Sequence, residues 1–244
     1  MSQNIYDDPT FFEGYSSLPR SIEGLAAAPE WPILRTYLPP LTSLRVLDLG
    51  CGFGWFARWA RSAGAESVRG VDISERMLGQ AREMTDDEGI TYERVDLDGG
   101  VLAGGEDGYD VVFSSLALHY LVRLRELVHE VHRVLKPGGT FVFSIEHPVY
   151  TAPSHAEFVT EELGRRYWPL NDYQREGGRV NDWLGGKVIK QHRTLTSYIN
   201  IFLETGFEIR GFHEWYPTPK EVEEKGWGEV LDRPIFLLMS VVKK

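Results

Sequence analysis

The chain has 244 residues, of which 42% are hydrophobic and 25% are charged, and this composition excludes disordered, collagen-like and disulfide-scaffold proteins. The formal net charge of −10, from 26 Lys and Arg against 36 Asp and Glu, disfavours a sequence-independent grip on nucleic acid or on an anionic membrane. The single cysteine, Cys51, excludes an internal disulfide and a structural zinc site built from several cysteines.

Between residues 45 and 145, short apolar runs alternate with helical patterns, as is typical of a parallel sheet flanked by helices. The predicted strands are Arg45–Leu49, Val68–Val71, Ile90–Val95, Asp110–Ser114 and Thr140–Ile145. Helices are predicted over Trp55–Ala63, from the N-cap Ser74 to Met84, and over the apolar repeat Leu124, Leu127, Val128, Val131 and Leu135, which the turn 136–139 ends. A last helix, Leu195–Thr205, is followed by Gly206 and by two closing strands, Phe207–Phe212 and Ile235–Val242.

Two stretches do not follow this alternation, and we interpret both as additions to one domain that spans residues 1–244. Residues 1–30 precede the first strand and are expected to form a lid segment. Residues 148–192 follow the fifth strand and hold, with their flank, many aromatic residues and arginines: Tyr150, Phe158, Tyr167, Trp168, Tyr173, Trp183, Arg165, Arg166, Arg175, Arg179 and Arg193. Aromatic rings supply rigid contact area and arginines supply donors, so we expect a substrate cap here. The alternative is a packed cluster that only covers the sheet edge.

The first predicted strand runs into a glycine-rich turn, Gly50-Cys51-Gly52-Phe53-Gly54, and then into a helix. Glycines allow a sharp turn and a close approach of backbone to a ligand, and the helix N-terminus offers unpaired N–H donors. Asp72 and Asp96 end the next two strands, so their carboxylates are expected at the same sheet edge, where open α/β folds bind ligands. A carboxylate in the position of Asp72 can accept both hydroxyls of a ribose.

The spacing of the glycines separates two classes of nucleotide site. A dinucleotide fingerprint reads G-x-G-x-x-G, whereas this turn reads G-x-G-x-G and has Trp55 where the last dinucleotide glycine would stand. Asp48, two residues before the turn, would repel a pyrophosphate but could hold a cationic group. The motif therefore points away from NAD and toward a nucleoside that carries an amino acid.

Taken together, the glycine turn, Asp72, Asp96, the segment 109–121 and the turn at 135–139 resemble the class I S-adenosylmethionine-dependent methyltransferases of small-molecule type. The resemblance covers residues 44–145 and agrees with the two closing strands. It implies a Rossmann-like, doubly wound, seven-stranded and mostly parallel sheet whose last strand is antiparallel. It also implies S-adenosyl-L-methionine as the methyl donor and S-adenosylhomocysteine as the product.

The resemblance implies a role for each matching position of the cofactor site. Gly50, Cys51 and Gly52 would line the methionine part, and Asp72 would take the ribose hydroxyls. The remaining matching positions would be Ile73 and Met77 beside the adenine, Asp96 and Leu97 at its amino group, and Ser114 to Leu116 next to the methyl group. From the residues themselves we add Asp48, which could hold a cationic group, and Tyr15 and Arg20 of the N-terminal segment. The guanidinium of Arg20 could bind the carboxylate of the cofactor bidentately. Plain packing is the alternative for Tyr15 and Arg20.

Two histidines are the candidate catalytic residues. His119 follows the fourth strand and His147 follows the fifth, so both should lie at the ligand edge, as a base or as a group that orients the acceptor. A hydrogen-bonded pocket wall is the alternative for each. No histidine spacing suggests a metal site, and none is predicted.

The predicted function is methyl transfer from S-adenosyl-L-methionine to an O, N or C atom of a small molecule. The alternatives are a non-catalytic S-adenosylmethionine-binding sensor or scaffold, and an NAD-dependent oxidoreductase, against which the glycine spacing argues. With no leader-like N-terminus and no apolar run of membrane-spanning length, we expect a cytoplasmic protein without membrane or nucleic-acid partners, and a homodimer is left open.

Overall fold

The computed structural model describes residues 3–244 and places a seven-stranded sheet at its centre, in the order β10-β11-β5-β4-β1-β2-β3. The strands are β1 (Arg45–Leu49), β2 (Ser67–Asp72), β3 (Ile90–Arg94), β4 (Tyr109–Ser115), β5 (Leu135–Glu146), β10 (Phe207–Glu214) and β11 (Phe236–Lys243). β11 pairs antiparallel with both of its neighbours, and the other pairs are parallel. The predicted fold class is confirmed, including the single antiparallel strand.

The one sizeable difference in this region concerns the predicted turn at residues 136–139. β5 begins at Leu135, and the turn lies inside the strand as an irregularity: Tyr109 pairs with Leu135, but Val111 pairs with Thr140. Gly138 takes a positive φ of 77° there, which a glycine adopts without strain. The turn residues therefore bulge out of a strand that continues beyond them.

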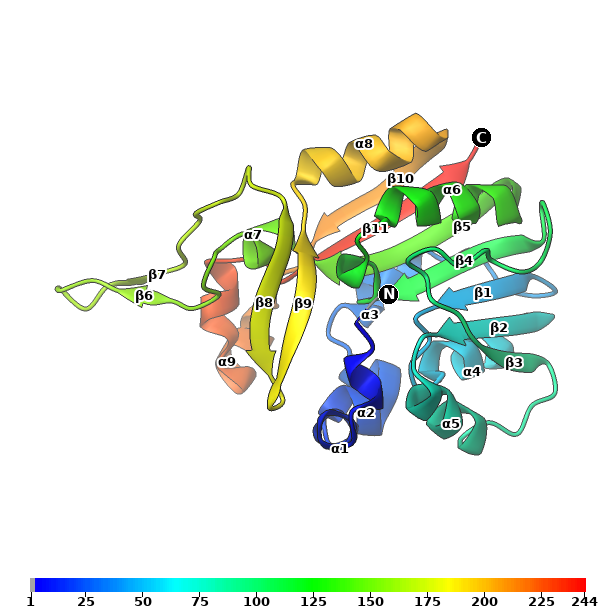
Figure 1. The fold of residues 1–244 in the computed structure, drawn as a ribbon, viewed down its shortest axis with the longest axis horizontal. Coiled ribbons are helices and arrows are strands. Elements are labelled where there is room, and N and C mark those ends of the chain that lie inside the picture. Colours follow the sequence, from blue (N-terminus) through cyan, green and yellow to red (C-terminus); the bar gives the residue numbers. More distant parts are fainter. Residues whose placement is uncertain (1–2) are drawn as a thin grey trace.

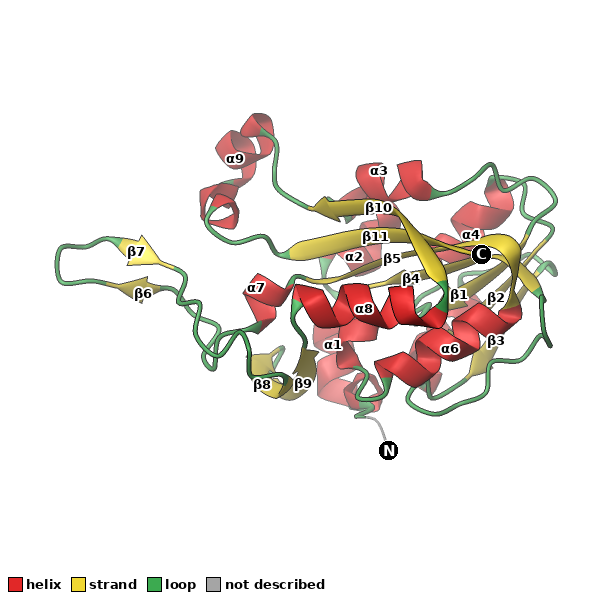
Figure 2. Cartoon of the chain, turned by 90° about the horizontal axis from the view of Figure 1, so that it is seen from above, coloured by secondary structure: helices red, strands yellow, loops and turns green. Residues whose placement is uncertain are grey.

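Helices cover both faces of the sheet (Figure 2). α6 (Leu124–Val134) and α8 (Leu195–Thr205) pack on one face, while the short α3 (Trp31–Leu34) and α4 (Trp55–Ser62) pack on the other. α5 (Glu75–Glu83) begins as predicted at Ser74, whose hydroxyl accepts a hydrogen bond from the Met77 N–H. Among the described residues, no helix is long and apolar enough to cross a membrane.

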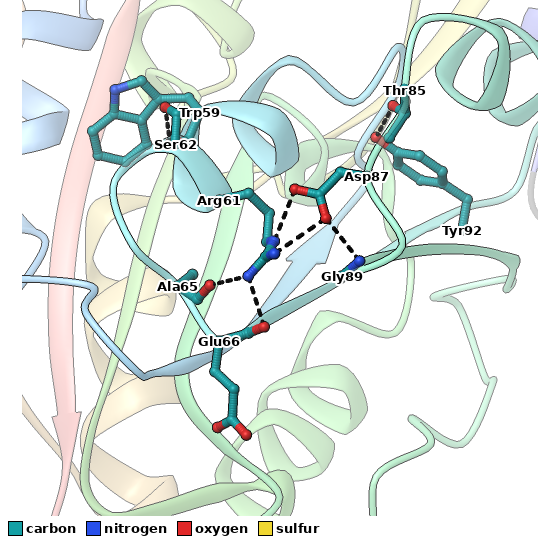
Figure 3. A network of polar contacts seen from close by, with 9 residues as sticks. All are labelled: Trp59, Arg61, Ser62, Ala65, Glu66, Thr85, Asp87, Gly89 and Tyr92. Carbon is teal, nitrogen blue, oxygen red and sulfur yellow. Dashed lines mark hydrogen bonds and ion pairs between the residues drawn. The ribbon is translucent and has the colours of Figure 1, made fainter.

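A network of hydrogen bonds centred on Arg61, near the C-terminus of α4, joins the amino ends of β2 and β3 (Figure 3). Arg61 donates to both carboxylate oxygens of Asp87, at 3.0 and 3.1 Å, and to the carbonyls of Ala65 and Glu66. Asp87 in turn accepts from the Gly89 N–H at 2.7 Å. These groups find their hydrogen-bond partners within the chain, and they fix the edge of the sheet opposite to the glycine turn.

The two stretches outside the alternation are both structured. The N-terminal residues form η1 (Ile5–Asp7), α1 (Pro9–Ser16), α2 (Pro19–Glu23), η2 (Gly24–Ala27) and, after α3, η3 (Arg35–Tyr37). The insertion forms α7 (Pro148–Thr151), a small β6 (Val159–Thr160) and β7 (Arg166–Tyr167) hairpin, and a longer hairpin of β8 (Gly177–Trp183) and β9 (Gly186–His192). The β8–β9 hairpin and the N-terminal helices lie beyond the ends toward which the arrows of β1 and β4 point (Figure 1).

A third structured segment was not anticipated from the sequence. The connection between β10 and β11 carries α9 (Pro219–Lys225) and η5 (Trp227–Leu231). α9 begins with a reciprocal capping box between Thr218 and Glu221. This connection reaches the same end of the sheet as the insertion (Figure 1).

Candidate active site

A cavity of 660 Å³ lies at the carboxyl ends of the parallel strands, within the size range of ligand sites in proteins. Its floor is formed by the residues that end β1, β2, β4 and β5, and its walls by the N-terminal helices, the β8–β9 hairpin and the connection before β11. The cavity therefore joins the predicted cofactor residues to both of the added stretches.

The glycine turn brings the main chain itself to the cavity. Gly50 has a φ of 70°, and a Cβ built on it would lie 2.4 Å from the Cβ of Ala117, so no larger residue fits. Gly52 has a φ of 50°, lines the cavity and has no heavy atom within 4 Å of a built Cβ. Open space in front of a bare backbone is the arrangement that lets a ligand approach closely.

Two carboxylates flank this turn. Asp72 lines the cavity and accepts from the Gly52 N–H and the Ser74 N–H, each at 3.0 Å, one bond on each of its oxygens. A carboxylate oxygen can accept more than one hydrogen bond. Asp48 is 2% exposed, and its Oδ2 has no hydrogen-bond partner among the described residues. Burial, and then the charge of Asp72, raises the pKa of Asp48 well above its usual range, and burial also raises the pKa of Asp72.

Of the other residues predicted at the cofactor, most line the cavity: Cys51, Ile73, Met77, Asp96 and Leu97. The pKa of the Cys51 thiol is raised well above its usual value by burial and by Asp48 and Asp72, so it remains a neutral thiol at neutral pH.

Ser114 was predicted to lie next to the methyl group, but it is the next residue, Ser115, that lines the cavity. The Ser114 hydroxyl is fully buried and donates to the Leu49 carbonyl at 2.9 Å, away from the cavity, whereas Ser115 and Leu116 line the cavity. Side chains alternate along a strand, so neighbouring positions of β4 point to opposite sides. Leu116 takes a positive φ of 54°, a strained conformation of the kind that gathers at ligand sites.

The two predicted residues of the N-terminal segment also reach the cavity. Tyr15 and Arg20 both line it. Arg20 forms a bidentate ion pair with Glu30, with two N–O distances of 2.8 Å, and Glu30 is 1% exposed. Both terminal nitrogens of Arg20 thus already hold a carboxylate of the chain, which leaves only part of its donor capacity for a ligand.

His119 lines the cavity, but its hydrogen bond defines its role. Its Nδ1 accepts from the backbone N–H of Glu146 at 3.3 Å, which assigns the ring proton to Nε2. Burial, with the charges of Lys190 and Arg193, lowers the pKa of His119 well below its usual value. The ring is therefore neutral near pH 7 and can offer a hydrogen bond to a ligand, but it has no free lone pair to act as a base.

His147 does not line the cavity, contrary to the expectation that placed it there. Its side chain is fully buried: Nδ1 accepts from the Val149 N–H at 3.0 Å, and Nε2 lies 2.9 Å from an oxygen of Glu214. Its backbone N–H also donates to the Ile235 carbonyl. With both ring nitrogens occupied, His147 caps α7 and ties it to Glu214 of β10 and to Ile235, the residue before β11.

Four charged residues of the cavity wall were missed in the sequence: Glu146, Lys190, Arg233 and Asp182, whose carboxylate pairs with Lys187. Glu146 ends β5, and its Oε1 lies 2.5 Å from the ammonium of Lys190 on β9. Burial raises the pKa of Glu146, opposed by Lys190. Arg233 comes from the connection before β11. Glu146 follows the same rule as Asp72 and Asp96, a carboxylate at a strand end, and could have been found by it; Lys190 and Arg233 carry no local signal.

The residues present fit S-adenosylmethionine on observations of this structure. The bare backbone at Gly52 provides space for the amino-acid part, the unpartnered Oδ2 of Asp48 suits a cationic ligand, and Asp72 can accept ribose hydroxyls. Within residues 3–244, no group of three or more His, Cys, Asp or Glu side chains gathers in a way that could hold a metal ion.

Comparisons with known proteins bear on the class of protein to which this chain belongs. A family model described as a methyltransferase domain matches residues 47–143. A solved structure of an S-adenosylmethionine-dependent methyltransferase from Mesorhizobium loti is 48% identical, with a TM-score of 0.85 over 90% of this chain and 100% of that one. A protein of Haemophilus influenzae is 32% identical over 98% of this chain and 97% of its own length.

A match of a different extent is found with the malonyl-[acyl-carrier protein] O-methyltransferase of Enterobacter lignolyticus. It is 36% identical over 111 residues, which are 46% of this chain and 42% of that enzyme. The shared part is therefore less than half of either protein.

Proposed function

The chain belongs to the S-adenosylmethionine-dependent methyltransferases, and we propose that it methylates a small organic molecule bound in the half of the cavity opposite to the glycine turn. The observation that carries the proposal is the single 660 Å³ cavity that holds both sets of residues. One set ends β1 and β2 and suits the nucleoside. The other comes from the insertion and from the connection before β11, which lie outside the residues matched by the family model.

The bound S-adenosylmethionine would supply an electrophilic methyl group on a positively charged sulfur. The chain's own contribution is then to align the acceptor atom with this methyl group and to exclude water. The Nε2–H of His119 would donate to an acceptor oxygen or nitrogen. Where the acceptor atom must lose a proton, Glu146, held by Lys190, is the group that would take it.

The N-terminal segment would act as the lid and the insertion as the cap. Gln3 exchanges hydrogen bonds with β9, at 2.7 Å to the Lys187 carbonyl and 2.8 Å from the Ile189 N–H. Asp7 accepts from the Ser74 hydroxyl at 2.6 Å, at the start of α5. The segment thus bridges the nucleoside side and the acceptor side. Opening these contacts would admit both ligands, and closing them would exclude water.

A small acceptor, rather than one attached to a carrier protein, is favoured by the extent of the matches. The malonyl-[acyl-carrier protein] methyltransferase shares less than half of its length with this chain. The β8–β9 hairpin and the N-terminal segment pack together at the cavity, where the Trp183 ring meets those of Phe11 and Tyr15 at 5.5 and 6.2 Å between centroids.

An acceptor screen tests the proposal. The chain is incubated with S-adenosylmethionine and a panel of small phenols, amines, carboxylic acids and enols. Transfer should add about 14 Da to an acceptor and release one S-adenosylhomocysteine for each methyl group, both read by mass spectrometry. Tight S-adenosylhomocysteine binding with no transfer to any class would instead favour a sensor or scaffold.

A further inference from the structure

The cations of the cavity wall differ in whether the chain neutralises them. Arg20 is paired with Glu30, and Lys190 is paired with Glu146. Arg233 forms no ion pair and no side-chain hydrogen bond with any residue between 3 and 244, and its Nε and Nη1 are buried without partners. Arg233 as a whole is only partly buried, but two of its donors are enclosed in the cavity wall without an acceptor, so an anionic group on the acceptor side of the cavity could pair with it.

Three aromatic rings hold the Arg233 guanidinium in place. Its central carbon lies 4.3 Å from the ring centre of Trp168, 4.8 Å from that of Tyr150 and 5.1 Å from that of Phe158. Contacts of this kind stabilise the charge through the ring faces. They leave the N–H donors, which lie in the plane of the guanidinium, without an acceptor.

The Trp168 and Tyr150 rings are held by α7, the short helix that follows β5. Trp168 donates its indole N–H to the Val149 carbonyl at 2.9 Å and stacks on Tyr150, with an interplanar angle of 4°. Val149 and Tyr150 belong to α7, which His147 caps. The aromatic residues of the insertion thus form a rigid support for one arginine, and this support lies next to the acceptor half of the cavity.

The surroundings of Arg233 define the rest of the ligand. Val230, Ile235 and Phe236, which flank it in sequence, line the same cavity and are apolar. The nearby acid, Glu146, is already neutralised by Lys190. An organic molecule with an apolar body and one anionic end would satisfy both the arginine and the wall.

We infer that the methyl acceptor is a small organic acid whose carboxylate is bound by Arg233. The inference rests on the proposed methyltransferase function and adds the acceptor's chemical class. A carboxylate matches the planar fork of a guanidinium and would pair with its free donors. Held there, the acid would be anchored at one end while the atom to be methylated points toward His119 and the glycine turn.

Paired probes test this without knowledge of the acceptor. The chain, saturated with S-adenosylhomocysteine, is titrated with benzoate, phenylacetate and hexanoate and with their neutral amides, and binding is followed by tryptophan fluorescence, since Trp168 lies under Arg233. Phenyl phosphate is titrated in parallel. At least one acid should bind about tenfold or more tightly than its amide, as expected for a charged hydrogen-bonded pair.

Variants separate Arg233 from general charge effects. Arg233→Met should bring the Kd values of acid and amide to within about twofold of each other. Arg166→Met is the matched control, because Arg166 also lies over Phe158, at 5.0 Å, but is exposed, pairs with Glu229 and does not line the cavity. It should keep the full preference. If Arg233→Met does not fold, Arg233→Lys, which keeps the charge but lacks the fork, should reduce the preference.

Three outcomes would overturn the inference: no preference for any acid in the wild type, a preference that survives in Arg233→Met, or a preference for phenyl phosphate alone. Calorimetric titration of S-adenosylhomocysteine into the same samples keeps the two proposals apart. If it does not bind, the methyltransferase proposal fails; if it binds normally and no acid is preferred over its amide, only the carboxylate site fails.

Discussion

The two edges of the central sheet treat their charged side chains differently. At the amino edge, Arg61 is surrounded by the carboxylate of Asp87 and by two backbone carbonyls, so its donors are satisfied by the chain (Figure 3). At the carboxyl edge, Asp48, Glu146 and Arg233 each line the cavity with a buried polar atom that has no partner among the described residues. Polar groups that serve the fold are normally paired, and we therefore propose these unpaired atoms at the cavity as the groups that contact a ligand.

The largest expected effect is on ligand binding, which a substitution at the carboxyl edge should weaken and one at the amino edge should not. Asp72→Ala removes an acceptor of two ribose hydroxyls, each charge-assisted hydrogen bond contributing about 1.5–3 kcal/mol. We expect S-adenosylhomocysteine to bind at least about tenfold more weakly, and about hundredfold if both bonds are formed, by isothermal titration calorimetry. Asp87→Ala at the amino edge is the matched control and should leave the Kd within about twofold. An unchanged Kd in a folded Asp72→Ala protein would remove Asp72 from the site.

Substitution at the amino edge should instead lower the stability of the fold. Asp87→Ala leaves the Arg61 guanidinium without its carboxylate, and Asp87 has a lowered pKa because Arg61 and the Gly89 N–H stabilise its charged form. Because the pair is partly exposed and screened by water, we expect Tm to fall by only about one to three degrees in a scanning calorimeter at pH 7. Because a lowered pKa contributes stability above the unfolded pKa, the deficit should shrink as the pH falls below about 4. A Tm equal to that of the wild type at pH 7 would contradict a structural role for this cluster.

At the carboxyl edge, we expect Asp48→Asn to raise stability and to weaken ligand binding. The folded-state pKa of Asp48 is raised, so the folded protein holds its proton more tightly than the unfolded chain, and the free energy of unfolding falls as the pH rises through the folded pKa. Asparagine has no proton to lose in this range, so the variant does not suffer this decrease in the free energy of unfolding. Without ligand, the variant should have a Tm at pH 7 that is higher than the wild type by a few degrees, a gain that disappears near pH 4. The same variant should bind S-adenosylhomocysteine more weakly. A lower Tm at pH 7 would show that the carboxylate stabilises the fold.

The smallest effect concerns His119. Its pKa is lowered in the folded protein, so the unfolded chain takes up a proton more readily below about pH 6.5, and stability is lost as the pH falls through that range. His119→Asn, which can still accept the Glu146 N–H, should make the dependence of unfolding free energy on pH between 7.5 and 5.5 shallower, by at most about 1.4 kcal/mol per pH unit. Urea unfolding at a series of pH values measures this. An unchanged slope would show that His119 is not buried in its neutral form.

The sequence predicted one half of the cavity and not the other for a physical reason. The nucleoside half is built at strand ends and at a glycine turn, where the position along the chain determines the position in the fold, so Asp48, Asp72 and Asp96 could be placed from their spacing alone. The acceptor half is assembled from α7, β9 and the connection before β11, which meet only through tertiary packing. Arg233 and Lys190 therefore stand in segments whose local pattern carries no sign of a site.

The errors have a similar origin. Ser114 and His147 were placed at the correct end of the correct strands, but their side chains turn away from the cavity to satisfy the Leu49 carbonyl and the α7 N-terminus. The direction of a side chain at a strand end depends on one residue of register and on which backbone groups need a partner. Spacing in the sequence defines the edge of the sheet but not this choice.

A crystal structure of the chain with S-adenosylhomocysteine tests the central claim most directly. The account predicts the ribose hydroxyl oxygens within hydrogen-bond distance of the Asp72 carboxylate, the amino-acid part over Gly52, and the sulfur facing the side of the cavity that His119 and Glu146 line. A molecule bound outside the cavity, or one bound with its ribose on the Arg233 side and its sulfur away from His119, would contradict it.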